Sequence, residues 1–282
     1  MFSMEAFSWY YVVAALVLIY NCSCNVRYYV RFIGAHIAVL VVSALVMPLL
    51  LFRPKNVYNA ILATIPLRLL NPLLRLNWDV QGVEHITPDR AAIVVCNHQS
   101  SIDFLGMVYM WPLFQKISAI AKMEILYAAP FGPTAWLCGT RFIDRSNPQK
   151  AKQSMNDAME FVKEHKVKLW IFPEGTRNSE DEFLPFKKGA FYLALQGQIP
   201  ILPLVCSSYR GFISHKAGVF NPGNIIVTCL PPIPTVGLTI EDMPSLMAET
   251  REKMMAVFKE TSAKVQQPYP LEVAPRTTSK ES

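Results

Sequence analysis

A histidine and an aspartate five residues apart follow directly on a predicted apolar strand at residues 91–96. In open α/β sheets, ligands bind at the carboxyl ends of the strands, which is where His98 and Asp103 would lie. In one continuous helix the two side chains would point about 140° apart. They can therefore meet only if His98 lies in the turn and Asp103 lies in the first turn of the next helix, which Ser100 or Ser101 can cap.

An imidazole beside a carboxylate is suited to take a proton from a hydroxyl group. Imidazole has an ordinary pKa of about 6.5 and acts as a general base near neutral pH. A carboxylate on its other nitrogen fixes the tautomer and stabilises the imidazolium. The alternative is structural, because Ser100 and Asp103 also fit a capping box at a helix start. A hydrolase is disfavoured, because Ser100 and Ser101 do not lie in a G-x-S-x-G turn.

A second cluster, Glu174-Gly175-Thr176-Arg177, follows the predicted strand at residues 168–172. Gly175 permits a backbone angle that other residues rarely adopt. The Thr176 hydroxyl and the forked guanidinium of Arg177 could hold one anion together, as in phosphate sites. The alternative is a surface turn with a solvated arginine.

Three further positions carry weaker signals. Arg145 follows a short predicted strand at residues 142–144 and could face the same cleft or pair with Asp144. Lys122 follows the predicted strand at 117–121, where it is a possible anion contact or a solvated side chain. Pro203 lies in a buried strand at 201–205, where a proline indicates an edge strand or a kink.

These segments occur in one order on one chain, which is far more specific than any single motif. Together they resemble the glycerolipid acyltransferase family with its H-x4-D motif, specifically the animal-type 1-acylglycerol-3-phosphate acyltransferases. The blocks that carry the resemblance are residues 97–106, 139–145, 172–178 and 201–209, with a proline-rich strand end at 230–235 and the N-terminal apolar segments.

The resemblance implies transfer of an acyl group from acyl-CoA to the sn-2 hydroxyl of lysophosphatidic acid, giving phosphatidic acid and CoA. His98 would be the general base and Asp103 its orienting carboxylate. Acyl-CoA would be a co-substrate, with no other cofactor and no metal. The residues implied on the acceptor's phosphate side are Arg145, Glu174, Gly175, Thr176 and Arg177, and the block that contains Pro203 is linked to acyl-CoA. The alternatives are acylation of glycerol 3-phosphate or another lysophospholipid, or a non-enzymatic lipid-binding scaffold.

The elements that must position these residues are short strands alternating with helices. This alternation predicts an α/β fold with a mixed, mostly parallel sheet flanked by helices. Predicted helices begin near Ser101, Pro148, Lys187 and Glu241. Predicted strands span residues 80–85, 91–96, 117–121, 142–144, 168–172, 201–205 and 225–230.

An N-terminal membrane-embedded helical segment precedes this fold. Hydrophobic residues make up 52% of the 282 residues and charged residues 17%, below the roughly 25% of soluble domains. Two apolar runs, 6–20 and 33–52, flank a stretch rich in aromatic residues and arginine, which is typical of a membrane interface. Arginines at both the connection and the far end favour a helical hairpin that enters one leaflet and returns. The predicted organisation is 1–56 membrane-embedded helices, 57–78 an interfacial linker, 79–266 a catalytic domain and 267–282 a disordered tail.

The net charge of +6 suits an anionic membrane surface or a phosphorylated substrate. Nucleic acid is not expected as a partner, because the lysines and arginines form no dense cluster. The six cysteines show no disulfide framework and no metal-ligand spacing, which fits a catalytic domain facing the cytosol. The family resemblance implies the endoplasmic reticulum membrane, and it leaves protein partners unknown.

Overall fold

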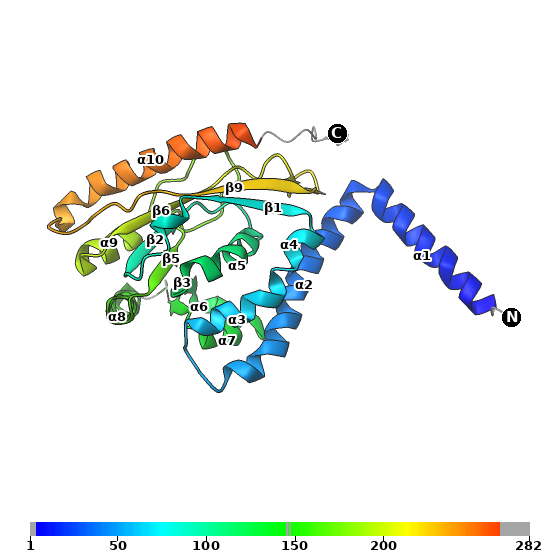
Figure 1. The fold of residues 1–282 in the computed structure, drawn as a ribbon, viewed down its shortest axis with the longest axis horizontal. Coiled ribbons are helices and arrows are strands. Elements are labelled where there is room, and N and C mark those ends of the chain that lie inside the picture. Colours follow the sequence, from blue (N-terminus) through cyan, green and yellow to red (C-terminus); the bar gives the residue numbers. More distant parts are fainter. Residues whose placement is uncertain (1–3, 145, 147, 266–282) are drawn as a thin grey trace, which may run out of the picture.

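A seven-stranded sheet forms the centre of the protein in the computed structural model, which describes residues 4–144, 146 and 148–265 (Figure 1). The strand order is β1-β9-β6-β2-β5-β3-β4, and every neighbouring pair is parallel except β6 with β9. The predicted mixed, mostly parallel sheet is thus confirmed. The strands are β1 Leu76–Gln81, β2 Ala92–Cys96, β3 Ile117–Lys122, β4 Arg141–Ile143, β5 Lys168–Ile171, β6 Ile201–Cys206 and β9 Gly223–Cys229, with β7 Ile213–Ser214 and β8 Val219–Phe220 as a separate hairpin.

Helices cover both faces of the sheet. They are α1 Met4–Cys22, α2 Cys24–Leu50, α3 Tyr58–Leu67, α4 Leu70–Leu73, α5 Asp103–Phe114, α6 Met123–Leu126, α7 Phe131–Leu137, α8 Pro148–His165, α9 Lys188–Gly197 and α10 Met243–Lys264. One core packs α8, α9 and α10 against residues such as Ile93 and Val95, and the other packs α5 against Val94 and Cys96. Strand β2 is therefore buried on both faces, which explains its unbroken apolar sequence.

Of the two N-terminal helices, α2 lies along the side of the domain and α1 extends away from it (Figure 1). Helix α2 has 27 residues and contains an 18-residue stretch with a mean hydropathy of 2.3, so it is long and apolar enough to cross a membrane, which indicates membrane association. It packs against α3, α7 and β8, whereas α1 bends away at Ser23. Arg31 fastens α2 to the domain, because its buried guanidinium donates hydrogen bonds to the carbonyls of Phe220 (2.8 Å) and Leu74 (2.9 Å).

The first strand differs from its predicted bounds. It begins at Leu76 and ends at Gln81, and the predicted continuation at 83–85 is a 3-10 turn. Gly82 causes the break, because its φ of 73° turns the chain and a Cβ there would lie 2.2 Å from the carbonyl oxygen of Cys229. Helices α6 and α7 and the β7–β8 hairpin were not predicted, because each is too short to show a recognisable repeat of apolar residues.

Pro203 lies inside the sheet, so of the two predicted alternatives, an edge strand or a kink, the edge strand is wrong. Its strand, β6, lies between β9 and β2. The carbonyl of Pro203 accepts a hydrogen bond from Leu230 N at 2.9 Å, so the proline nitrogen points to the β9 side. The ladder to β9 begins only at Leu204, where it pairs with Cys229, and the missing N–H therefore breaks no ladder bond.

Gly106 in α5 provides a test of the packing between α5 and β1. A Cβ at this position would lie 2.8 Å from two ring atoms of Trp78. That ring cannot swing aside freely, because it is buried and its Nε1 donates to Asn71 Oδ1 at 2.8 Å. Gly106→Ala should therefore destabilise the protein by about 1–3 kcal/mol, measured as a lower thermal unfolding midpoint. Gly34→Ala is the control, because no atom of the described residues lies within 4 Å of a Cβ there. Equal midpoints for both variants would contradict this packing.

Candidate active site

The side chains of His98 and Asp103 meet at the carboxyl end of β2. His98 Nδ1 lies 2.6 Å from Asp103 Oδ2, with His98 in the turn and Asp103 as the first residue of α5. The same carboxylate oxygen accepts the backbone N–H groups of Gln99 (2.9 Å) and Ser100 (3.2 Å). An oxygen that already accepts two N–H groups acts as an acceptor toward the ring, so His98 Nδ1 carries the proton and Nε2 has a free lone pair. Asp103 thus both orients the imidazole and shapes the turn.

Glu174 holds the backbone of His98 in place. Its Oε1 accepts the N–H of His98 at 3.0 Å, and its Oε2 accepts the N–H of Leu184 at 2.9 Å. The residue is only 2% exposed, and burial raises the pKa of its carboxyl, which these two backbone donors partly offset. The N–H of Asn178 in turn donates to the carbonyl of His98 at 2.7 Å. The loop after β5 therefore binds both the backbone N–H and the backbone carbonyl of the histidine.

Asn97 and Gln99 tie the same turn to the end of β6. Asn97 forms a paired contact with Cys206, in which its Nδ2 donates to the carbonyl (2.9 Å) and its Oδ1 accepts the N–H (2.8 Å). Gln99 Nε2 donates to the carbonyl of Ser207, and its Oε1 accepts the N–H of Tyr209. The ring of His98 stacks on Phe172 with centroids 3.9 Å apart. All these contacts limit the motion of the imidazole.

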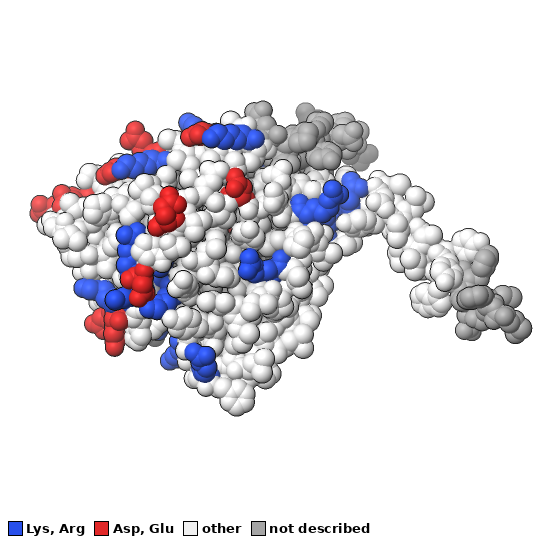
Figure 2. Space-filling model, in the orientation of Figure 1, with Lys and Arg blue, Asp and Glu red and all other residues white. Residues whose placement is uncertain are grey.

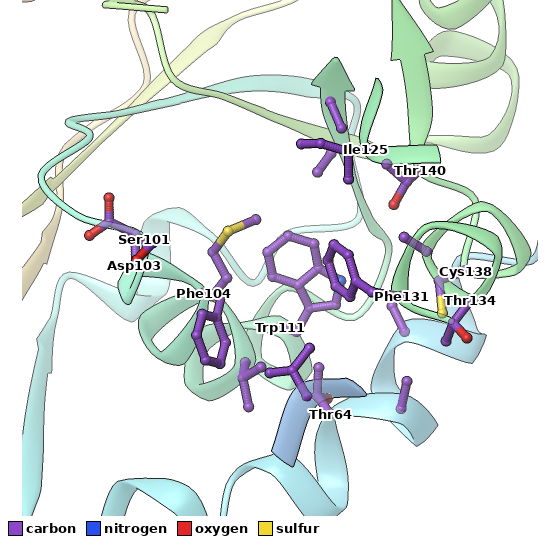
Figure 3. Close-up of a pocket in the computed structure, with 18 of the residues that line it drawn as sticks. Thr64, Ser101, Asp103, Phe104, Trp111, Ile125, Phe131, Thr134, Cys138 and Thr140 are labelled. Atoms are coloured by element: carbon purple, nitrogen blue, oxygen red, sulfur yellow. The ribbon is translucent and has the colours of Figure 1, made fainter. Parts of the chain in front are cut away.

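A cavity of about 710 Å³ adjoins this pair (Figure 3). Figure 3 shows Asp103 and Ser101 at one end and Thr134, Cys138 and Thr140 at the other, with Phe104 and Trp111 between them. The wall between the ends is mainly apolar and includes side chains from the membrane-associated helix. Among its apolar residues are Val39, Val42, Val46, Leu67, Phe104, Met107, Trp111 and Phe131. The site thus joins a polar end that contains a base to a long hydrophobic space.

The predicted site residues fall into three groups. Those that line the cavity are His98, Asp103, Lys122, Gly175, Thr176 and Arg177. Gly175 has a φ of 71°, so the expected unusual backbone angle is confirmed. The structure places Glu174 and Pro203 elsewhere: both Glu174 oxygens are occupied by backbone N–H groups, and Pro203 is buried in β6 opposite Val95. Arg145 lies outside the described residues.

A hydrogen-bonded chain that the sequence did not indicate links the turn to the membrane-associated helix. His215 lies between Tyr28 of α2, at 2.7 Å from its hydroxyl, and Ser100, at 2.9 Å from its Oγ. Burial lowers the pKa of His215, with smaller contributions from the charges of Arg177 and His36. Ser100 lines the cavity, and it is therefore held in place by His215, a residue outside the H-x4-D motif. The sequence separation of these residues exceeds 100, so no local pattern could reveal the contact.

The chain is similar to known acyltransferases in sequence and in fold. Residues 77–207 match the acyltransferase family. The chain is 38% identical over 247 residues to human 1-acyl-sn-glycerol-3-phosphate acyltransferase alpha, covering 88% of this chain and 87% of the relative. It is 40% identical over 190 residues to the 1-acyl-sn-glycerol-3-phosphate acyltransferase of Saccharomyces cerevisiae, covering 67% and 62% of the two chains. The fold matches the crystal structure of PlsC, the 1-acyl-sn-glycerophosphate acyltransferase of Thermotoga maritima, with a TM-score of 0.63 at 20% identity over 85% of this chain and 97% of that one.

The role of Glu174 as a backbone anchor is testable by Glu174→Gln. Glutamine keeps one acceptor oxygen, but its NH₂ group must face one of the two buried N–H donors. Leaving a buried donor unpaired should cost about 1–3 kcal/mol, which thermal unfolding would detect. Glu182→Gln is the matched control, because Glu182 lies in the same loop and is exposed. If both variants unfold at the wild-type temperature, Glu174 does not support the turn.

Proposed function

The chain belongs to the 1-acyl-sn-glycerol-3-phosphate acyltransferase family, and from this premise we propose that it acylates the sn-2 hydroxyl of lysophosphatidic acid with acyl-CoA as the donor. The products would be phosphatidic acid and CoA. The observation that carries the proposal is the His98–Asp103 pair at 2.6 Å, at the polar end of a long apolar cavity. A base beside such a cavity fits a hydroxyl acceptor and a fatty acyl donor.

In this mechanism His98 takes a proton and later returns it. Nε2 accepts the proton of the sn-2 hydroxyl while the hydroxyl oxygen attacks the thioester carbonyl carbon and forms the new C–O bond. Collapse of the tetrahedral intermediate breaks the C–S bond, and the departing sulfur of CoA takes the proton from Nε2. Asp103 remains ionised throughout and stabilises the imidazolium through Nδ1–H. The enzyme returns to its starting state, and no covalent acyl-enzyme forms.

The acceptor's phosphate would bind beside His98 on the loop after β5. Thr176 and Arg177 line the cavity there, and a guanidinium can donate two parallel hydrogen bonds to phosphate oxygens. Lys122 lines the same cavity from the end of β3 and adds a second positive charge. The family resemblance assigns Arg145 to the same phosphate. Binding the phosphate at this position would hold the sn-2 hydroxyl close to Nε2.

The donor's acyl chain would occupy the apolar part of the cavity. Each buried CH₂ group stabilises binding by about 0.8 kcal/mol, so a long chain is held mainly by the walls formed by α2, α3 and α5. Because α2 supplies part of that wall, both lipid substrates would reach the site from the bilayer. We place the enzyme in the endoplasmic reticulum membrane with its catalytic domain toward the cytosol, as the family resemblance implies.

Asp103→Asn tests the role of the carboxylate in catalysis. All three donors bind Oδ2, so an asparagine oxygen in the same place can accept all of them. The asparagine Nδ2 then replaces Oδ1, which has no hydrogen-bond partner among the described residues, so the charge is lost without loss of a hydrogen bond. We expect turnover to fall on the order of 10²-fold or more with little change in unfolding temperature. His98→Ala should abolish transfer, and exposed Asp79→Asn should have no effect. Normal turnover per folded molecule in Asp103→Asn, with lowered stability, would leave Asp103 only a structural role.

Substitution of Arg177 separates recognition of the acceptor from recognition of the donor. Arg177→Lys should raise the KM for lysophosphatidic acid, and Arg177→Ala should raise it by about tenfold to a hundredfold, because one charge-assisted contact is worth roughly 1.5–3 kcal/mol. The KM for acyl-CoA should change much less. Steady-state kinetics with both substrates varied would measure this. Arg210→Lys is the control, because Arg210 pairs with Asp181 and does not line the cavity. An Arg177 variant that weakened only acyl-CoA binding would refute the assignment.

A further inference from the structure

The segment that connects β3 to β4 exposes an uncharged, aromatic-rich surface. Residues 125–140 contain no charged side chain. Four large apolar side chains from α6, α7 and the turn between them are exposed, and Tyr127, in that turn, is the most exposed of them at 77%. The four are Ile125, Tyr127, Phe131 and Trp136, which we call the α6–α7 surface. Exposed apolar side chains gathered in this way mark a protein or membrane contact.

The α6–α7 surface is held directly against the membrane-associated helix. Helix α7 packs on α2, and Thr134 Oγ1 donates to the carbonyl of Ser43 at 3.1 Å. The carbonyl of Leu137 accepts Asn59 Nδ2 from α3 at 2.9 Å. Helix α2 buries the face that carries Ser43 and leaves its opposite face exposed, including Ile37 and Leu45. The two apolar surfaces therefore belong to elements that pack directly against each other.

The charges around this unit fit an anionic lipid surface. Residues 6–78 contain six lysines and arginines and no aspartate or glutamate. Figure 2 shows the acidic side chains over other parts of the molecule, while the charged side chains in the region of α2 and α3 are lysines and arginines. Lys55 lies over the ring of Trp136, 4.9 Å from its centroid, and tryptophan and lysine are both side chains that suit a bilayer interface. Glu124 is the one acidic residue of α6.

The same surface borders the cavity. Ile125 and Phe131 are both exposed to solvent and part of the cavity wall. Figure 3 shows Phe131 beside Trp111, inside the cavity, with Ile125 above them. A bilayer that covered the α6–α7 surface would thus meet the cavity directly. A protein partner in that position would instead separate the cavity from lipid.

We propose that the α6–α7 surface inserts into the interface of an anionic bilayer as a membrane contact of the catalytic domain itself, separate from the N-terminal helices. Its occupant is lipid, and Tyr127, Phe131 and Trp136 reach the level of the headgroups. This contact brings the cavity to the bilayer, where its apolar wall meets the acyl chains. The inference rests on the membrane association of α2 and does not depend on the acyl-transfer chemistry.

A fluorescent label at position 127 tests the contact in the full-length protein. The exposed Cys22 and Cys24 are replaced by serine, the four buried cysteines are kept, and Tyr127→Cys is labelled with an environment-sensitive dye. Val236→Cys is the matched control, because Val236 is apolar and equally exposed (78%) but belongs to no part of this surface. The proteins are reconstituted into vesicles of phosphatidylcholine with phosphatidylserine. The label at 127 should shift to shorter wavelength and be quenched by a nitroxide-bearing lipid, and the label at 236 should do neither.

Two results would overturn the proposal. Equal emission and no lipid quenching at both positions would mean that the α6–α7 surface stays in water. Protection from aqueous iodide without quenching by lipid would mean that a second copy of the chain covers it. Neither result depends on enzyme activity, so failure of this proposal would leave the proposed function untouched.

Turnover on vesicles gives a second readout. Tyr127 is absent from the cavity wall, so Tyr127→Glu alters the surface without altering the wall. A charge near the interface is disfavoured only modestly, so we expect turnover of vesicle-borne lysophosphatidic acid to fall by about two- to fivefold. Tyr127→Phe and Val236→Glu should keep wild-type turnover. Equal turnover of Tyr127→Glu and wild type would count against the contact.

Discussion

The contact between Asp103 Oδ2 and three donors is the constraint on which the rest of the site depends. A single oxygen receives the imidazole N–H and two consecutive backbone N–H groups, so the orientation of His98 and the shape of its turn are determined together. Glu174 completes the restraint from the opposite side by accepting the N–H of His98. Two buried carboxylates thus hold one histidine: N–H groups satisfy both oxygens of Glu174, and three N–H groups converge on Oδ2 of Asp103. The active-site geometry therefore exists before any substrate binds.

This rigid turn lies at a boundary between two environments. On one side are Thr176, Arg177 and Lys122, which suit a phosphate, and on the other is an apolar cavity walled in part by α2. Arg31 and the Tyr28–His215–Ser100 chain connect α2 to the catalytic domain. The helix that associates with the membrane therefore also builds the substrate cavity. Such a construction suits a reaction whose two substrates and one product are lipids.

The features of the site that depend on residues close together in the sequence were predictable from local sequence patterns. His98, Asp103 and Arg177 follow apolar strands in the chain, and parallel strands bring such ends together, so their meeting at one cavity was predictable. Glu174 was predicted as a phosphate contact, but it binds the backbone of His98. The two residues are 76 positions apart, so no local sequence pattern could indicate this contact. Helices α6 and α7 are too short to show a period. The edge-strand alternative for Pro203 was wrong because the hydrogen-bonded pairing of two strands can end inside a sheet, and a proline just beyond that end breaks no bond.

The most direct test of the central claim is an experimental structure with lysophosphatidic acid and a non-reactive thioether analogue of acyl-CoA. The measured quantity is the distance from His98 Nε2 to the sn-2 hydroxyl oxygen. A distance of about 2.6–3.2 Å, with the His98–Asp103 contact unchanged and the acyl chain along Trp111, is the result that our account predicts. A hydroxyl bound out of reach of Nε2, with no bridging water and another side chain in contact with it, would contradict the assignment of His98 as the base.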